Sequence, residues 1–255
     1  MRRKLTVILF YVALLAAWQL IFLAGVMPPY LLPSPFMVAQ RLVEMAKDGL
    51  LWTGIRATLT RMSIGFSLAA LIGLTFGVFM GTSTTVNRCL RSLLLGMQTL
   101  PSVAWVPISL LVFGLRDQGI YFVIIMSSVA AFAISTADGI AHIPPLYLRA
   151  ARTLGTPRRA MWYRVILPAA LPGIVTGLKL GWTLGWHGAV SAELIKSSIG
   201  LGYLLHMGRE LNDISQVVGI MLLTVAVGLL IDRFIFGKIE HRIRLHWGLL
   251  PEGSE

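Results

Sequence analysis

The chain has 255 residues, of which 56% are hydrophobic and only 13% are charged, and its mean hydropathy is +0.77. A soluble domain is usually about one-quarter charged, so this composition excludes a disordered chain and argues against a water-soluble globule. The charged minority is unbalanced, with 22 Lys and Arg against 11 Asp and Glu. This excess indicates either an anionic polymer as partner or a membrane protein whose basic residues face one side.

Six stretches come close to the roughly 20 apolar residues that a membrane-crossing helix needs. The third stretch contains Pro101 and Pro107, which predict either a kinked span or a re-entrant pair of helices. We therefore expect an all-α, polytopic membrane protein with about six transmembrane helices, forming a single domain over residues 1–255. The expected spans are Leu5–Val26, Met62–Gly81, Leu93–Leu115, Gly119–Ala137, Ile174–Val190 and Ile214–Ile231.

The basic residues are distributed unevenly between the two sides of this six-span arrangement. With the N-terminus in the cytoplasm, cytoplasmic segments carry 14 Lys and Arg residues and the opposite segments carry 7, while Lys179 lies within the fifth span. Lys and Arg gather in the cytoplasmic loops of membrane proteins. The bias predicts a multi-pass protein of the bacterial inner membrane with both termini in the cytoplasm, and the chain carries no motif for a nucleic-acid partner.

Between the first two expected spans, the segment from Pro33 to Trp52 alternates apolar and polar residues at helical spacing. Ser34 is a suitable N-cap and Pro35 fits the first turn of a helix. We expect an amphipathic helix that lies on the outer face of the membrane.

One long cytoplasmic loop, residues 142–172, separates the fourth and fifth spans. A short helix is expected over Leu146–Leu154, and Gly155 is a suitable helix stop. A second helix is expected over Pro157–Ile166, since proline can open a helix that it cannot continue. The alternative is a basic loop that only follows the positive-inside rule, but such a loop needs no defined helix, turn and second helix.

This loop resembles the EAA signature of ABC importer permeases. Ala150-Ala151 is followed after three residues by Gly155, and after nine more by Val165-x-Leu167-Pro168. Arg149 departs from the pattern, because the family has Glu at this place. In the family this loop forms a coupling helix that docks in a groove of the ATPase subunit. The resemblance implies such a role for Arg149, Ala150, Ala151, Arg152, Leu154, Gly155, Pro157, Leu167 and Pro168.

Further motifs resemble the nitrate, taurine and sulfonate subfamily of these permeases. They are Leu32-Pro-Ser-Pro-Phe36, Leu100-Pro-Ser-Val-Ala-Trp-Val-Pro107 leading into Phe113-Gly114, and Gly177-Leu-Lys-Leu-Gly-Trp with Ala192-Glu193 and Gly200-Leu-Gly-Tyr203. The resemblance covers about residues 5–240 and implies a fold similar to type I ABC importers. It places the importer core at residues 53–236 and the coupling loop at residues 142–172.

The resemblance also implies partners. A cytoplasmic ABC ATPase dimer would use ATP and Mg, because the chain lacks a P-loop: Gly237-Lys238 is followed by Ile239 rather than by Ser or Thr. A periplasmic or lipid-anchored substrate-binding protein would deliver the substrate, and two copies of the permease would form the path through the lipid bilayer as a homodimer. No cofactor or metal is expected on this chain, and Cys89 alone forms no Cys-based zinc site.

The fifth span carries the features that bear on transport. A ridge of glycines at four-residue spacing, which predicts close packing against another helix, consists of Gly173, Gly177, Gly181 and Gly185. A stripe on the roughly opposite face consists of Lys179, Trp182, Trp186 and Glu193. We expect this stripe, with His187, to line or flank the substrate path, where Lys179 would favour an anion. The alternatives are that Lys179 snorkels to the cytoplasmic headgroups and that the two indoles serve packing.

A second candidate for the path is the proline break of the third span, at Gln98, Thr99 and Pro101. Such a break exposes backbone carbonyls that can line a cavity, although a simple kink explains it equally well.

The leading hypothesis is the membrane subunit of an ABC importer for a small anion such as taurine, another sulfonate or nitrate. The same kind of permease carrying bicarbonate or a neutral heterocycle stays open. A stand-alone secondary transporter or channel is the alternative from another class, and it would not need a projecting helix with this spacing. The sequence carries no catalytic motif that would support an enzymatic function for this chain.

Overall fold

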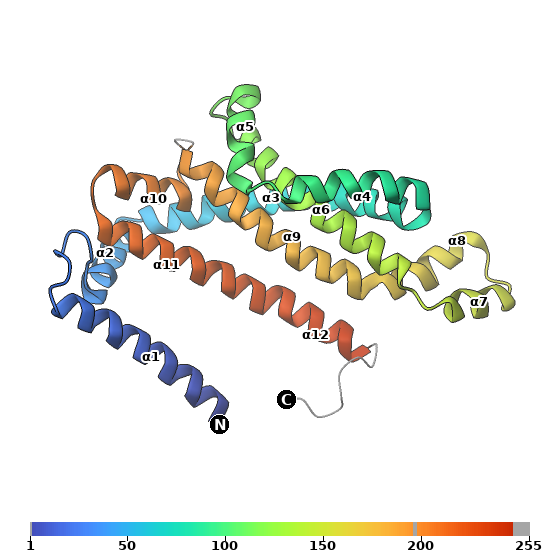
Figure 1. Cartoon of the computed structure of the whole chain (residues 1–255), viewed down its shortest axis with the longest axis horizontal. Helices are drawn as coiled ribbons and strands as arrows, with labels where there is room; N and C mark the ends of the chain where they lie inside the picture. Colours follow the sequence, from blue (N-terminus) through green and yellow to red (C-terminus); the bar gives the residue numbers. More distant parts are fainter. Residues whose placement is uncertain (1, 196–197, 247–255) are drawn as a thin grey trace. The chain divides into compact units, whose positions relative to one another are not determined.

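The computed structural model describes residues 2–195 and 198–246, and every regular element among them is a helix (Figure 1). The predicted cytoplasmic C-terminus, from residue 247 on, lies outside the described residues. The helices are α1 (Arg2–Leu23), α2 (Pro35–Lys47), α3 (Leu50–Thr82), α4 (Thr84–Gln98), the 3₁₀ turn η1 (Ser102–Trp105), α5 (Val106–Phe113), α6 (Asp117–Ala141), α7 (Pro145–Thr153), α8 (Arg158–Met161), the π turn η2 (Trp162–Ile166), α9 (Leu167–Ile195), α10 (Leu201–Glu210), α11 (Ile214–Ile231), the π turn η3 (Asp232–Phe236) and α12 (Gly237–His246).

Five helical segments of the described residues are long and apolar enough to cross a membrane, which confirms the all-α, multi-pass prediction. They are Leu5–Leu23, Leu50–Thr82, Asp117–Ala141, Arg158–Ile195 and Ile214–Glu240. The expected third span is a broken pair, in which α4 and the η1–α5 segment meet at an angle of 100°. Its first limb begins at Thr84, nine residues before the expected start at Leu93.

The described chain forms two compact units. Unit 1 contains Met1–Thr58 and Glu193–Ala226, and unit 2 contains Leu59–Ala192 and Val227–Glu255. The boundaries fall within the long helices α3, α9 and α11, so each unit consists of two separate stretches of the sequence.

The core of unit 2 is built around α6, which is packed on two sides by glycine ridges. On α9, a side chain added at Gly173 would meet Gly139 of α6, and one added at Gly177 would meet Ser135. On α3, Gly73 approaches Phe132 of α6 in the same way. Because glycine lets helix backbones approach closely, the ridge predicted on the fifth span does hold two helices together.

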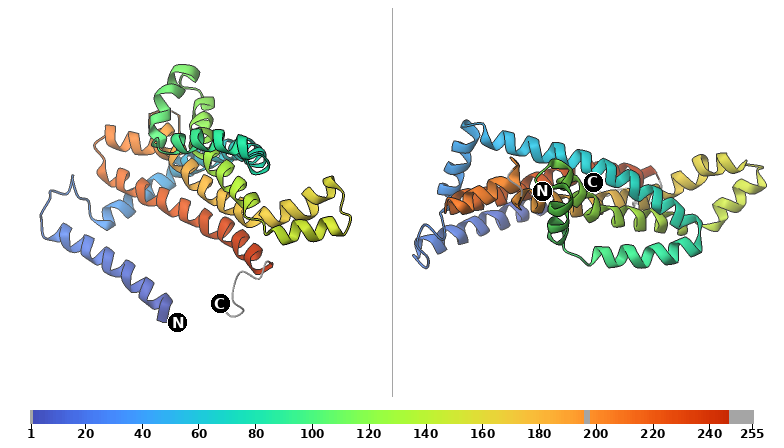
Figure 2. Two further views of the ribbon diagram at one scale, coloured as in Figure 1. Left: turned by 45° about the vertical axis from the view of Figure 1, so that its right-hand side comes forward. Right: turned by 90° about the horizontal axis from the view of Figure 1, so that it is seen from above.

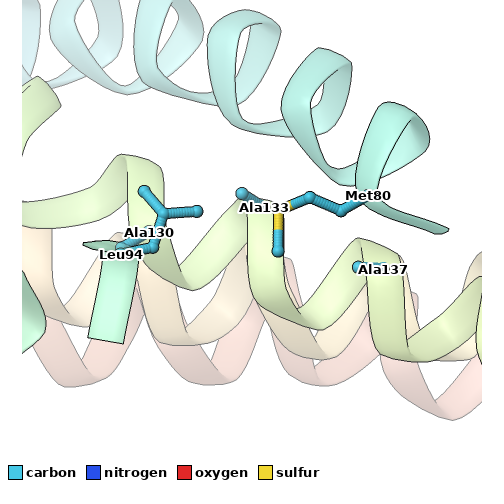
Figure 3. Close-up of a cluster of buried hydrophobic side chains, with 5 residues drawn as sticks. All are labelled: Met80, Leu94, Ala130, Ala133 and Ala137. Carbon is cyan, nitrogen blue, oxygen red and sulfur yellow. The ribbon is translucent and has the colours of Figure 1, made fainter. Parts of the chain in front are cut away.

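A small apolar cluster extends this packing to α4. Figure 3 shows three alanines of α6, Ala130, Ala133 and Ala137, beside Met80 of α3 and Leu94 of α4. An ion pair between Arg91 and Asp138 joins α4 to α6.

In unit 1, α2 begins where its sequence predicts. Ser34 is the N-cap, and its hydroxyl accepts a hydrogen bond from the Met37 amide at 3.2 Å. Arg41 of α2 forms an ion pair of 2.7 Å with Asp213, and it donates a hydrogen bond of 3.0 Å to Gln216 of α11. These contacts fix α2 to the start of α11. Helix α1 exposes most of its apolar side chains, as a lipid-facing helix would.

Candidate functional site

The coupling-loop candidate is the hairpin of α7 and α8, which extends beyond the adjoining ends of α6 and α9 (Figures 1 and 2). Helix α7 ends at Thr153 with Leu154 as its C-cap, and Gly155 follows with a left-handed φ of 73°. The Thr156 amide donates to the Ala151 carbonyl at 3.1 Å, and the Gly155 amide donates to the Arg152 carbonyl at 3.0 Å. This pair of hydrogen bonds is the Schellman motif, which confirms the predicted helix stop.

The side chains of α7 divide into an attached face and an exposed face. Ala151 is buried, and Leu148 packs against the apolar cluster of Ile143, Ala170 and Ile174. The exposed residues include Arg149, Ala150 and Arg152, and Leu154 is 84% exposed. A rigid helix that presents apolar and cationic groups together has the character of a protein-docking surface.

The second helix of the loop does not end near Ile166, so that expectation was wrong. Helical backbone runs from Arg158 through η2 into α9, and it passes both Pro168 and Pro172. Proline in a regular helix loses a hydrogen bond and clashes with the carbonyl four residues before it. The π turn η2 widens the helix immediately before Pro168, so the chain accommodates this proline without breaking. The loop is therefore stiff on its α9 side.

Lys179 of α9 faces two carboxylates of unit 2. Its Nζ lies 3.6 Å from an Asp232 oxygen and 3.4 Å from a Glu240 oxygen. Asp232 is in η3 and Glu240 is in α12, so the ion pairs tie α9 to the helix that follows α11. Two nearby acids balance the charge of Lys179, which lowers the cost of a cation within a membrane span.

Trp182 and Trp186 lie side by side on α9, as the predicted stripe requires. Their rings form part of an aromatic cluster. Their rings are stacked at 6.1 Å, and Trp182 also contacts Phe66 of α3 and Phe236 of η3. Both indoles are buried. The Trp182 Nε1 has no hydrogen-bond partner among the described residues, whereas the neighbouring His187 is exposed.

Glu193 lies in unit 1, near the end of α9, and is fully buried. Its carboxylate accepts a hydrogen bond of 2.7 Å from the Thr58 hydroxyl and one of 3.2 Å from the Gly202 amide. The Thr58 hydroxyl in turn accepts from the Leu201 amide at 2.8 Å. The two groups therefore satisfy the first amides of α10, a role that acidic and hydroxyl groups favour.

The proline break keeps its three candidates together at the bend between α4 and η1. Gln98, Thr99 and Pro101 are all exposed, and the Thr99 hydroxyl donates to the Gly96 carbonyl at 2.7 Å. Within the described part of the chain, no hydrogen bond or ion pair joins these three residues to Lys179 or to the aromatic cluster.

The sequence reasoning missed three buried polar residues. Thr58 binds Glu193, Arg61 forms an ion pair of 3.1 Å with Asp117, and Gln216 bonds both Arg41 and the Leu204 carbonyl. Polar residues at the edges of apolar spans were the available signal, because such residues need partners when they are buried.

This geometry is that of a multi-pass helical membrane protein in which a rigid helix, stopped by a glycine, projects between two spans. The chain matches the family model of the binding-protein-dependent transport system inner membrane component over residues 73–244. The chain belongs to this family and is a permease subunit of an ABC importer.

Several curated permeases are similar to this chain. The bicarbonate transport system permease protein CmpB of Synechococcus elongatus is 34% identical, and the match covers 73% of this chain and 67% of the relative. The taurine transport system permease protein TauC of Escherichia coli is 31% identical over 77% of this chain and 74% of the relative. The nitrate import permease protein NrtB of Synechocystis is 29% identical over 80% and 78%.

A solved structure supports the fold. The inward-facing MetNI methionine ABC transporter matches with a TM-score of 0.66 at 18% identity, covering 76% of this chain and 96% of the compared chain. At this identity the likeness speaks for the fold alone.

Proposed function

We propose that this chain forms the transport path of an ABC importer for a small anion, and that a separate ATPase drives it through the loop of residues 142–172. The observation that carries the coupling role is helix α7, whose Gly155 stop and buried Ala151 hold an exposed face rigidly in place. A docking helix must transmit motion, and a stiff connection to α9 through η2 suits that task. ATP and Mg would be used by the partner ATPase dimer.

The proposed substrate class rests on the relatives. The permeases to which this chain is similar are named for bicarbonate, nitrate and taurine transport. These three substrates share an oxyanion group and small size. We propose that this chain also transports bicarbonate, nitrate, taurine or an aliphatic sulfonate. Transport of a neutral heterocycle instead would distinguish it from these relatives.

The proposed path follows the α9 face of Trp182, Trp186 and His187. The buried rings of Trp182 and Trp186 and the exposed imidazole of His187 would form one side of a path that opens and closes as the spans rearrange. Lys179 contributes there as part of its ion cluster, since its charge is already balanced by Asp232 and Glu240. Glu193 and the proline break at Gln98, Thr99 and Pro101 remain further candidates for residues that line the path.

The assembly proposed around the chain follows from its family. Two copies of the permease, with an importer core at residues 53–236, would enclose the path in the bacterial inner membrane. A periplasmic or lipid-anchored binding protein would dock outside, and both termini would lie in the cytoplasm with α7. The charge bias of the loops supports this orientation.

The coupling role is tested by Gly155→Val in the permease reconstituted with its ATPase and binding protein in liposomes. A β-branched residue is strained at positive φ, so the end of α7 must rearrange. We expect the ATPase to lose its stimulation by loaded binding protein. Gly25→Val is the matched control, because Gly25 has a similar φ of 65° with no atom within 4 Å of an added Cβ. Uptake that stays intact in Gly155→Val, by a permease that never retains an ATPase subunit, would favour a stand-alone transporter.

The same liposomes identify the substrate. Each candidate anion and one neutral heterocycle are offered with the binding protein, and stimulated ATP hydrolysis and uptake are measured together. We expect stimulation by one class of oxyanion. Stimulation by the neutral compound alone would overturn the proposed substrate class while leaving the importer assignment intact.

A further inference from the structure

A cavity of about 300 Å³ lies inside unit 2, at the base of the α7–α8 hairpin. It is partly open and is lined by α3, α6, η2 and the first turns of α9, with walls that include Val78, Ile140, Trp162 and Ile174. The lining is almost entirely apolar. The volume is at the lower end of the range for small-molecule sites, so the cavity suits part of an extended apolar ligand.

One polar group lines this cavity without a partner. Thr136 of α6 is 1% exposed, and its hydroxyl has no hydrogen-bond partner among the described residues. Earlier hydroxyls of the same helix behave differently: Ser127 donates to the Val123 carbonyl at 2.8 Å and Ser128 to the Ile124 carbonyl at 2.6 Å. Buried hydroxyls are normally satisfied. Thr136 therefore offers a donor to an occupant that is apolar but carries an acceptor atom.

The mouth of the cavity is aromatic and basic. Tyr163 lines the cavity and is 73% exposed. Arg159 lies one helical turn before Tyr163, Arg158 directly precedes Arg159, and Arg164 directly follows Tyr163; all three arginines are exposed and lie next to the lining residues in the chain. Tyrosine and tryptophan gather at the headgroup level of membranes, and basic pockets between spans on the cytoplasmic side bind anionic headgroups.

We propose that this cavity holds part of one acyl chain of an anionic phospholipid from the cytoplasmic leaflet. The arginines would hold the headgroup phosphate, and the Thr136 hydroxyl would donate to an ester oxygen of the lipid. The proposal rests on the orientation given under the proposed function, and it is independent of the transported substrate. A lipid bound in this cavity would fill the space between η2, at the base of the coupling hairpin, and α6. It would therefore influence how α8 and η2 move.

Quenching of Trp162 by brominated acyl chains tests the proposal. The complex of permease and ATPase is placed in nanodiscs of phosphatidylcholine with a few mole per cent of brominated phosphatidylglycerol or brominated phosphatidylcholine. The contribution of Trp162 is the difference between the parent and Trp162→Phe. We expect preferential quenching by the anionic lipid, with a preference of about five-fold for each arginine engaged.

Three variants with matched controls decide the outcome. Val78→Phe fills the cavity and should abolish the quenching, whereas Val225→Phe, at an exposed position of α11, should not. Arg159→Gln should lower the preference for the anionic lipid about five-fold, whereas Arg88→Gln should leave it unchanged. Thr136→Val keeps the shape of the side chain and should weaken the quenching.

Equal quenching by both lipids would overturn the headgroup assignment. Quenching that survives Val78→Phe, or its absence in every mixture, would overturn the lipid site and indicate that water or a protein surface occupies the cavity. Retention of the ATPase in the same nanodiscs is measured in parallel. If the ATPase is lost from the nanodiscs while the quenching persists, the result counts against the proposed coupling role and leaves the lipid site standing.

Discussion

At the scale of single residues, Glu193 shows how two separate motifs of the sequence serve one structure. Glu193 and the segment Gly200-Leu-Gly-Tyr203 are adjacent in unit 1, because the Glu193 carboxylate accepts a hydrogen bond from the Gly202 amide. Gly200 packs against that carboxylate, where a larger residue would collide with it. The motif therefore ties the end of α9 to the start of α10, whatever part Glu193 plays in transport.

Thr58→Val removes the hydroxyl that joins these groups and keeps the shape of the side chain. It leaves the buried Leu201 amide without its acceptor and removes one hydrogen bond that the buried Glu193 carboxylate accepts. The free energy of unfolding should fall by about 2–3 kcal/mol. We expect a lower midpoint of thermal unfolding in detergent. Thr58→Ser retains the hydroxyl and should stay near the parent. Equal stability of the valine and serine variants would show that the hydrogen bonds are unimportant.

The ion cluster around Lys179 leads to a prediction about uptake. Lys179→Ala leaves Asp232 and Glu240 without their shared cation, so we expect reduced uptake of an anionic substrate with ATPase assembly retained. Asp232→Asn added to Lys179→Ala removes part of the uncompensated charge and should restore part of the uptake. If Lys179 instead bound the substrate directly, the second change would give no recovery in the liposome assay.

At the scale of helices, the close approach of α9 to α6 depends on Gly173. A Cβ at this position would lie 2.6 Å from the Gly139 Cα and 3.2 Å from the Ser135 carbonyl oxygen. Backbone atoms cannot move aside as a flexible side chain can, so the two helices must separate.

Gly173→Ala should therefore lower the thermal midpoint of the detergent-solubilised permease by several degrees, since a shift of about 1 kcal/mol changes it by about 2–4 °C in a chain of this size. Gly96→Ala in α4 is the control, because no atom lies within 4 Å of its added Cβ. Alanine is the better helix former, so Gly96→Ala should be neutral or stabilising. A neutral Gly173→Ala would mean that the ridge is not a packing contact.

Local signals made α2 and α7 predictable from the sequence. Ser34 and Gly155 act on backbone groups within a few residues, so their positions alone define a helix start and a helix stop. The continuity of α8, η2 and α9 was not predictable in this way, because proline usually interrupts a helix and the π turn before Pro168 has no simple sequence signal.

Long-range partners were also beyond the pattern of the sequence. Thr58 and Glu193 are 135 residues apart, and Lys179 and Glu240 are 61 apart. Helical periodicity places residues on faces, but it does not say which helix covers a face. For this reason the stripe on α9 was correctly assembled from Trp182 and Trp186, whereas the acids that balance Lys179 became evident only in the fold.

At the scale of the whole molecule, the excess of basic residues is an orientation signal that one native residue can test. Cys89 is the single cysteine of the chain and is exposed at the start of α4. It lies between Arg88 and Arg91, in a segment that the charge bias assigns to the cytoplasm. A membrane-impermeant maleimide should therefore label the unmodified protein in inside-out vesicles and not in intact spheroplasts.

Leu31→Cys in a Cys89→Ser background provides the opposite control. Leu31 is 54% exposed and follows α1, on the side predicted to face outward, so its thiol should react in spheroplasts and be protected in inside-out vesicles. The two thiols lie in separate units of the chain, and reciprocal labelling would fix the orientation of both. Labelling of Cys89 from outside would invert the topology, and α7 would then face away from any cytoplasmic ATPase.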